Sequence, residues 1–268
     1  MTKEFAITLV GAAAALLFTT GCAERSAALF APVGRTSCSD LPALQRPLKV
    51  ANYNIKSGLW TSLADVGDTL ATMDADVVAL EEVDNGTRRS GSVDESAVLA
   101  DRLHMQRIFA AALARDGGTY GVALLSKLPM LDDAERVDLP DVGNFEPRVA
   151  IDATICRGDA PLRVLAAHAD VFPWAAQAQA KFIADRVDGS ANTLVLGDLN
   201  ATPDTGDTKP FLDDGYADAL SMFDDKPTFP GNKTRIDYIL SDDAVASAHV
   251  LDSQASDHFP VVATIAPQ

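Results

Sequence analysis

Short apolar segments, most of them ending in a polar residue, recur along this chain and constrain its fold more than any other feature. The predicted strands span residues 48–55, 76–83, 106–113, 119–126, 147–156, 161–169, 193–198, 235–240, 246–251 and 259–265. Longer stretches at 61–73, 94–103 and 174–187 have the pattern of helices. So many strands with so few helices predict an α/β fold, in which two packed sheets are covered by helices.

Residues 47–268 are expected to form one domain, because no Gly/Ser-rich linker interrupts them. A Rossmann domain is disfavoured, since no GxGxxG motif follows any predicted strand. Hydrophobic residues make up 47% of the chain and charged residues 22%, a balance that excludes intrinsic disorder, collagen and coiled coil.

The chain is strongly acidic, with 38 Asp and Glu against 22 Lys and Arg and a net charge of -16. Such a surface repels phosphate backbones, so tight nonspecific binding of nucleic acid is not expected. A phosphate ester held in a local metal site is still compatible with this charge, because a divalent cation reverses the sign of the field there.

The start of the chain has the features of an export signal. The apolar run FAITLVGAAAALLF follows Lys3 and is shorter than the roughly 20 residues that a membrane-spanning helix needs. The next residues, Thr-Thr-Gly-Cys, resemble the cleavage box of bacterial lipoproteins, in which the cysteine is lipidated and becomes the new N-terminus. We therefore predict a signal peptide over residues 1–21 and a lipid anchor on Cys22. The anchor would attach the exported chain to a bacterial membrane, where the domain faces the periplasm or the cell exterior. Plain secretion without an anchor is the alternative.

Residues 22–46 mix small, polar and proline residues, which is typical of a tether between a membrane and a domain. Export places the two remaining cysteines, Cys38 and Cys156, in an oxidising compartment. An even pair there favours a disulfide between the leader segment and a core strand, and two buried free thiols are the alternative.

Polar side chains stand where the apolar strands end. Asn54 ends the first strand and the pair Glu81 and Glu82 ends the second. The others, at the ends or beginnings of later strands, are His168, Asp198, Asn200, Asp237, Asp257 and His258. Each alone has an ordinary explanation, such as a turn or a solvated surface residue. Together they indicate a functional rim, because a sheet holds groups at its strand ends in a fixed arrangement.

The motifs around these residues occur in the order typical of one known family. They are NYNIKSG, LEEVD, YGVALLSKLP, EPRVAI, AAHAD, GDLNATP, TRIDYIL and SDHFPV. From about Lys49 to Ile265 the chain resembles the endonuclease/exonuclease/phosphatase superfamily, whose fold is that of deoxyribonuclease I. The resemblance implies a four-layer α/β sandwich with two central mixed β-sheets flanked by helices. It also implies hydrolysis of a phosphate ester with Mg²⁺ or Mn²⁺ as the cofactor.

The resemblance assigns a metal-binding role to Glu82, Asn54 and Asp257, and oxygen ligands suit the hard cations Mg²⁺ and Mn²⁺. Asp198 and Asn200 match the residues that position the attacking water and bind the phosphoryl oxygens. Glu81 departs from the family, which usually has Gln at this position.

The same resemblance pairs His258 with Asp237, whose carboxylate would orient the imidazole ring. It makes His168 a proton donor to the leaving oxygen or a contact to the phosphate, and it leaves open whether Asp198 or His258 is the base. Arg148 is expected to brace the rim or the substrate, and Arg88 and Arg89 to bind a second phosphate, a solvated pair being the alternative.

The substrate follows from neither the motifs nor the fold. The acidic charge and the predicted anchor favour a small phosphate ester or a lipid headgroup, with a phosphate-ester substrate as the partner of a monomeric enzyme. A metal-dependent nuclease acting on DNA or RNA is the main alternative, and a noncatalytic binding lipoprotein on the same fold is the second.

Overall fold

The computed structural model describes residues 29–30, 35–143, 146–224 and 226–267. The predicted signal peptide and Cys22 lie outside these residues. No helix in the part of the chain that the structure describes is long and apolar enough to cross a membrane.

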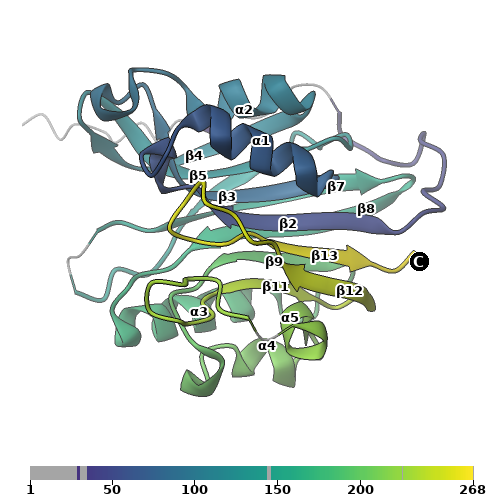
Figure 1. Ribbon diagram of the computed structural model, residues 1–268. Helices are drawn as coiled ribbons and strands as arrows, with labels where there is room; N and C mark the ends of the chain where they lie inside the picture. Colours follow the sequence, from purple (N-terminus) through teal and green to yellow (C-terminus); the bar gives the residue numbers. More distant parts are fainter. Residues whose placement is uncertain (1–28, 31–34, 144–145, 225, 268) are drawn as a thin grey trace, which may run out of the picture.

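Two mixed β-sheets stack face to face at the centre of the molecule (Figure 1). The seven-stranded sheet has the order β1 (Leu29–Phe30), β4 (Gln106–Arg115), β5 (Gly118–Ser126), β3 (Val77–Asn85), β2 (Leu48–Asn54), β13 (Val261–Ile265) and β12 (Val245–Val250). The six-stranded sheet has the order β10 (Ala217–Asp218), β11 (Asp237–Ser241), β9 (Thr193–Asp198), β8 (Ala160–His168), β7 (Val149–Arg157) and β6 (Glu135–Asp138). Each sheet contains one parallel pair, β2 with β3 and β8 with β9, among antiparallel neighbours.

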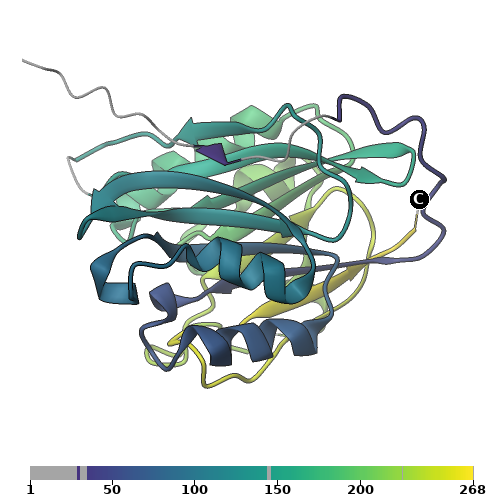
Figure 2. The same cartoon turned by 90° about the horizontal axis from the view of Figure 1, so that it is seen from above.

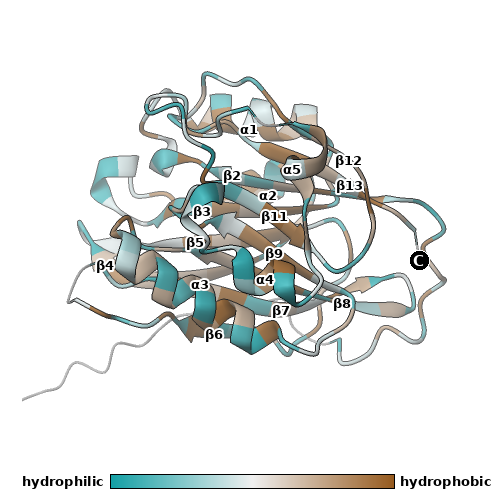
Figure 3. Ribbon diagram, turned by 90° about the horizontal axis from the view of Figure 1, so that it is seen from below, coloured by the Kyte–Doolittle hydropathy of each residue, from teal (hydrophilic) through white to brown (hydrophobic). Residues whose placement is uncertain are grey.

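Helices cover the outer faces of the sheets, as the views from above and below show (Figures 2 and 3). They are α1 (Leu63–Met73), α2 (Glu95–Leu103), α3 (Pro173–Val187) and α4 (Lys209–Asp213), with 3₁₀ turns η1 (Lys56–Gly58), η2 (Arg88–Ser90) and η3 (Pro203–Thr205). The short helix α5 (Ala219–Phe223) instead packs against β11 and β12 and contributes Ala219 and Leu220 to the cluster between the sheets. The predicted four-layer α/β sandwich is therefore confirmed. The short elements β6, α4 and α5 escaped prediction because four or five residues carry too little periodicity.

Three apolar clusters hold the layers together. The largest lies between the sheets and joins Val50 and Val77 of one sheet to Val164 and Leu196 of the other. A second cluster packs α1 and α2 against the seven-stranded sheet, and a third packs α3 and α4 against the six-stranded sheet. Because side chains alternate along a strand, most of the longer strands contribute to the central cluster and to an outer cluster in turn.

The leader segment is bound to the domain at two places. β1 pairs with β4 at the edge of the seven-stranded sheet, and Cys38 forms a disulfide with Cys156 of β7. The two sulfurs pack with Leu131 and the partly buried Leu41. The described part of residues 22–46 therefore contacts the domain, whereas a simple tether would only connect it to a membrane.

Candidate active site at one rim of the sandwich

The register of the strands brings the predicted polar residues to one rim. Asn54, the last residue of β2, faces Glu81 in the parallel strand β3, and His168 faces Asp198 at the ends of β8 and β9. Asp237, the first residue of β11, faces Asp198 on its other side. Leu196, Ala166 and Ile239 belong to the central cluster, so the polar residues two positions away point between the sheets.

Glu82 reaches this rim because β3 is bulged. The pairing with β5 shifts between Leu80 and Val83, and Glu82 has a positive φ of 57°. A bulge of this kind redirects a side chain out of the normal alternation. Ser57 donates to the Glu82 carbonyl oxygen at 2.9 Å and supports the strained backbone.

Asn54 links the two sheets at the rim. Its Nδ2 donates to Glu82 Oε1 at 3.2 Å and to Asp198 Oδ2 at 3.1 Å. Its Oδ1 accepts the backbone N–H of Lys56 at 3.2 Å. In this arrangement the Asn54 amide holds the carboxylates in place, while its oxygen is used by the backbone.

The ammonium group of Lys56 faces the two carboxylates that are predicted to bind metal. Lys56 Nζ lies 3.7 Å from Glu82 Oε1 and 3.2 Å from Asp257 Oδ2. Two carboxylates that share one ammonium ion offer the hard oxygen ligands and the negative charge that Mg²⁺ or Mn²⁺ requires. Glu82 and Asp257 therefore fit a divalent cation.

Asp198, Asp237 and His258 form a deeper set of potential ligands, with one ligand atom of each within 4.8 Å of the others. Within this set, His258 Nδ1 already shares a hydrogen bond of 2.9 Å with Asp237 Oδ2. The backbone N–H of Asp237 donates to Thr228 Oγ1 at 3.1 Å and helps to fix this residue. This fixed pair is suited to holding a proton on His258.

The environment of His258 favours its charged form. Burial by itself lowers its pKa, but Asp237, Asp198 and Asp257 more than offset that effect and raise the pKa to about 10. The partly buried ring of Phe229 packs on the imidazole, with 4.8 Å between the ring centroids. Phe229 was not predicted, because an apolar residue in a Pro/Gly-rich turn gives no sequence signal of this contact.

His168 has the opposite character. Burial, followed by the positive charges of Arg148 and His258, lowers its pKa well below the usual value. Arg148 Nη1 lies 3.0 Å from His168 Nδ1 and 3.2 Å from Nε2. The guanidinium is anchored in turn by Glu146, 3.4 Å away, another residue that the sequence did not point to.

Asp198 sits between the two histidines. Its Oδ2 is 3.7 Å from His168 Nε2 and 3.8 Å from His258 Nε2. Burial, and then the charge of Asp237, raise its pKa to about 7. A carboxyl group with this pKa can gain and lose a proton near neutral pH.

Asn200 lies beside Asp198, and its side-chain amide bonds to the protein backbone. Its backbone N–H donates to Asp198 Oδ1 at 2.9 Å, and its Nδ2 donates to the carbonyl oxygen of Ala169 at 3.0 Å. Asn200 thus orients Asp198 and the residue that follows His168.

The side chains of the two arginines predicted to bind a second phosphate pair with different carboxylates. Arg88 pairs with Asp116 at the β4–β5 turn and is largely exposed. Arg89 makes two bonds of 2.7 Å to Asp84 and one of 2.8 Å to Ser57. The structure thus gives each arginine a carboxylate partner, and a role in substrate binding stays a prediction.

Glu81 lies fully buried under the rim. Among the described residues neither of its carboxyl oxygens has a hydrogen-bond partner, and the same holds for Asn52 Oδ1. Burial, followed by the charges of Asp237 and Asp198, raises the pKa of Glu81 well above its usual value. Burial thus favours the neutral form of the acid that stands in place of the family's Gln.

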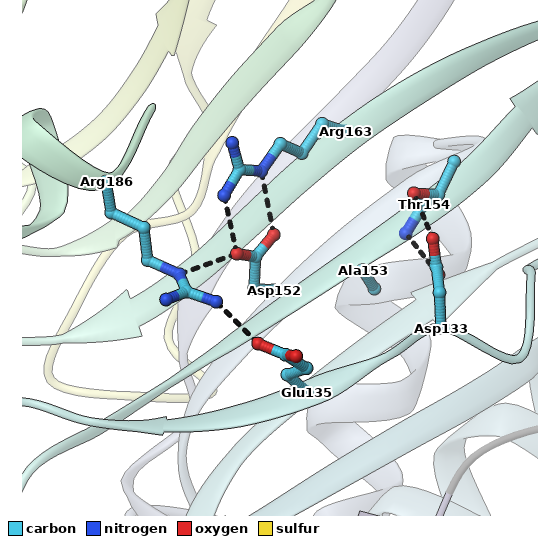
Figure 4. Close-up of a pocket in the computed structure, with 7 residues that line it drawn as sticks. All are labelled: Asp133, Glu135, Asp152, Ala153, Thr154, Arg163 and Arg186. Atoms are coloured by element: carbon cyan, nitrogen blue, oxygen red, sulfur yellow. Dashed lines mark hydrogen bonds and ion pairs between the residues drawn. The ribbon is translucent and has the colours of Figure 1, made fainter. Parts of the chain in front are cut away.

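A separate cavity of about 250 Å³ lies on the outer face of the six-stranded sheet (Figure 4). Arg163 and Arg186 both bind Asp152 there at 2.7 Å, and Arg186 also binds Glu135 at 2.6 Å. These ion pairs join β6, β7, β8 and α3. Because both arginines are paired with carboxylates, the cluster has no excess positive charge that could bind an anionic ligand.

The two mixed sheets, the outer helices and the rim of carboxylates and histidines define an α/β sandwich of the deoxyribonuclease I-like class. The sequence model of the Endonuclease/Exonuclease/phosphatase family matches residues 51–258, and the chain belongs to this family. No curated protein matches the chain.

Solved structures share the fold at low sequence identity. An endonuclease/exonuclease/phosphatase from Beutenbergia cavernae has a TM-score of 0.67 and 22% identity, covering 83% of this chain and 72% of that one. The human Nocturnin catalytic domain with bound sulfate anion has a TM-score of 0.67 and 19% identity, covering 85% and 97%. Truncated Caenorhabditis elegans TDP2 has a TM-score of 0.63 and 20% identity, covering 82% and 97%.

Proposed function

We propose that this chain is a divalent-metal-dependent phosphoesterase that hydrolyses a small phosphate ester or a lipid headgroup by in-line attack of water. One observation carries the proposal: Asp198 Oδ2 lies within 3.8 Å of the Nε2 atoms of both His168 and His258, beside the Glu82–Asp257 pair. A proton acceptor, a charged donor, a neutral donor and a cation-binding pair therefore meet at one rim.

Asp198 is the better base of the two groups that the sequence left open. With a pKa of about 7 it is ready to accept the proton of the attacking water near neutral pH. His258, with a pKa of about 10, already holds a proton. Its imidazolium places a positive charge against the phosphoryl oxygens, where charge develops in the transition state.

His168 contributes a hydrogen bond, since its imidazole is neutral. Arg148 fixes the ring and supplies a second positive charge close to it. Glu82 and Asp257 would hold a divalent cation, which would supply positive charge to neutralise the phosphoryl oxygens. Enzymes on this fold use such cations, and the oxygen ligands of this chain suit Mg²⁺ or Mn²⁺.

Export and anchoring complete the proposal. The signal over residues 1–21 and the cleavage box ending at Cys22 support a lipoprotein that faces the periplasm or the cell exterior. Replacing Cys22 by Ser should abolish detergent partitioning of the processed protein. Unchanged membrane association of Cys22→Ser would contradict the lipid anchor.

A hydrolysis panel tests the activity. It contains short-chain phospholipids, sphingomyelin, inositol phosphates, RNA, and single-stranded and duplex DNA, each with Mg²⁺, with Mn²⁺ and with chelator. We expect turnover of a small ester or lipid, and we expect chelator to stop it. The rate should fall as the pH drops below about 7, because Asp198 then becomes protonated and no longer acts as a base. Turnover of DNA or RNA alone would favour the nuclease, and no turnover by wild type would favour a binding protein.

A further inference from the structure

Both tryptophans of the chain, Trp60 and Trp174, have more than half of their surface exposed, at 57% and 56%. Exposed apolar residues accompany each of them, Leu59 beside the first and Val171 and Phe172 beside the second. Large apolar groups that stay in water and gather around a site indicate an interaction surface.

Strand topology places both groups at the rim of the active site. Leu59 and Trp60 follow η1, which begins with Lys56, and Thr61 donates to the carbonyl oxygen of Ala255 in the loop that carries Asp257. The second group starts three residues after His168 and runs into α3. The two groups therefore flank the catalytic residues. The first group lies on the loop after β2 and the second on the loop after β8.

A third loop extends the second group. Gln179 of α3 donates to the carbonyl oxygen of Pro140, in the loop between β6 and β7 that also exposes Val142. The rings of Phe172 and Trp174 stack with centroids 5.2 Å apart. We call these residues the apolar rim: Leu59, Trp60, Val142, Val171, Phe172 and Trp174.

We propose that the apolar rim docks the enzyme on the surface of a zwitterionic phospholipid bilayer and presents lipid headgroups to the active site. The inference rests on the proposed function and selects the lipid headgroup as its substrate class. Indole rings are suited to this boundary, since they combine a large apolar surface with an N–H that remains in the wet headgroup layer.

Charge and composition favour a bilayer over a nucleic acid. The net charge of -16 repels phosphate polymers and anionic membranes but does not act against a neutral headgroup layer. Aliphatic residues such as Leu59, Val142 and Val171 cannot stack on bases, whereas they enter the boundary between headgroups and acyl chains.

The length of the leader segment is consistent with this orientation. β1 runs antiparallel to β4, and Leu29 pairs with Ala110, so Leu29 lies on the rim side of Phe30. Cys22 precedes Leu29 by seven residues, which span at most about 25 Å. An anchor on Cys22 would therefore hold the domain close to the membrane.

Tryptophan fluorescence tests the proposal directly, because both reporters lie on the proposed surface. The exported chain carrying Cys22→Ser, which cannot be lipidated, is mixed with phosphatidylcholine vesicles in chelator. We expect a blue shift, quenching by brominated phosphatidylcholine, and sedimentation with the vesicles that added phosphatidylserine does not strengthen. No shift and no sedimentation would overturn the inference.

Variants locate the surface and separate it from catalysis. Trp60→Ala/Trp174→Ala should reduce vesicle binding at least about tenfold, while Leu212→Ala, an exposed apolar residue on α4, should not. Hydrolysis of a dispersed short-chain phospholipid should stay unchanged in the double variant, and hydrolysis of vesicle lipid should fall. Equal binding by the double variant, or a selective loss of oligonucleotide binding, would contradict bilayer docking. Vesicle binding without hydrolysis of any ester would refute the proposed function alone.

Discussion

His258 and His168 face the same carboxylate oxygen of Asp198, yet their surroundings favour the charged form of His258 and the neutral form of His168. Asp237 outweighs the effect of burial on His258 and, with Asp198 and Asp257, raises its pKa to about 10, whereas burial and then Arg148 lower the pKa of His168. A neutral His168 can bind a phosphoryl group without adding a third positive charge to those of His258 and Arg148.

Removing His258 should be the most damaging change at the rim. We expect His258→Ala to lose at least about 100-fold in turnover, because the positive charge facing the transition state disappears. Asp237→Asn should lose less, since the ring remains but is held in a poorer orientation. Glu82→Ala should weaken cation binding, so its rate should partly recover with excess Mg²⁺. Rates measured against Mg²⁺ concentration distinguish them, and near-normal turnover by His258→Ala would refute its assignment.

Lys56 competes with the divalent cation for Glu82 and Asp257, from 3.7 Å and 3.2 Å. Two charges at this distance interact by about 1 kcal/mol in water, so Lys56→Met should bind Mn²⁺ roughly tenfold more tightly. Calorimetry or the electron paramagnetic resonance of free Mn²⁺ measures this without activity. Lys127→Met, which removes an ammonium paired with Asp74, is the matched control. Weaker binding by Lys56→Met would show that the lysine supports the cation site instead.

The bulge in β3 and the start of α2 form one structural unit behind Glu82. Glu95, the first residue of α2, accepts the backbone N–H of Asp84 at 2.7 Å, two residues beyond Glu82. Asp94 caps the helix by accepting the N–H of Ala97. The orientation of a predicted metal ligand is therefore set partly by a helix that makes no contact with the phosphate site.

Glu95 makes the stability of this unit depend on pH. Burial raises its pKa from 4.5 to about 8. Above pH 4.5 the unfolded state loses this proton and the folded state keeps it, so stability falls by up to about 1.4 kcal/mol per pH unit until about pH 8. Glu95→Gln should remove this slope and unfold at higher urea concentration than wild type at pH 8. Parallel urea titrations of both proteins at pH 4.5 and 8 test it, and equal slopes would contradict it.

At the scale of the whole molecule, the active-site rim and the disulfide lie at opposite ends of β7. β7 begins at Val149, next to Arg148 of the rim, and Cys156 stands near its other end. The bond joins residues separated by 118 positions and so restricts a long loop of the unfolded chain.

Loss of the disulfide should lower stability and leave the chemistry intact. The free energy of unfolding of the double variant Cys38→Ser/Cys156→Ser should be about 2–5 kcal/mol lower than that of the oxidised wild type. Reduction of the wild-type protein should have the same effect. Turnover at low temperature should remain normal, because no rim residue contacts the bond. Urea titration with and without reductant measures the first effect, and a loss of activity in the still-folded variant would contradict the second.

The sequence determined the ten longer strands and the rim residues, because apolar alternation and the polar residue that ends a strand are both local features. Asn54, His168 and Asp198 were recognisable for this reason. Tertiary structure alone decided how they act. The Lys56 contact to Asp257, the Phe229 contact to His258 and the different protonation states of the two histidines depend on residues distant in sequence. Burial and electrostatic interactions act through space, so no local pattern encodes them.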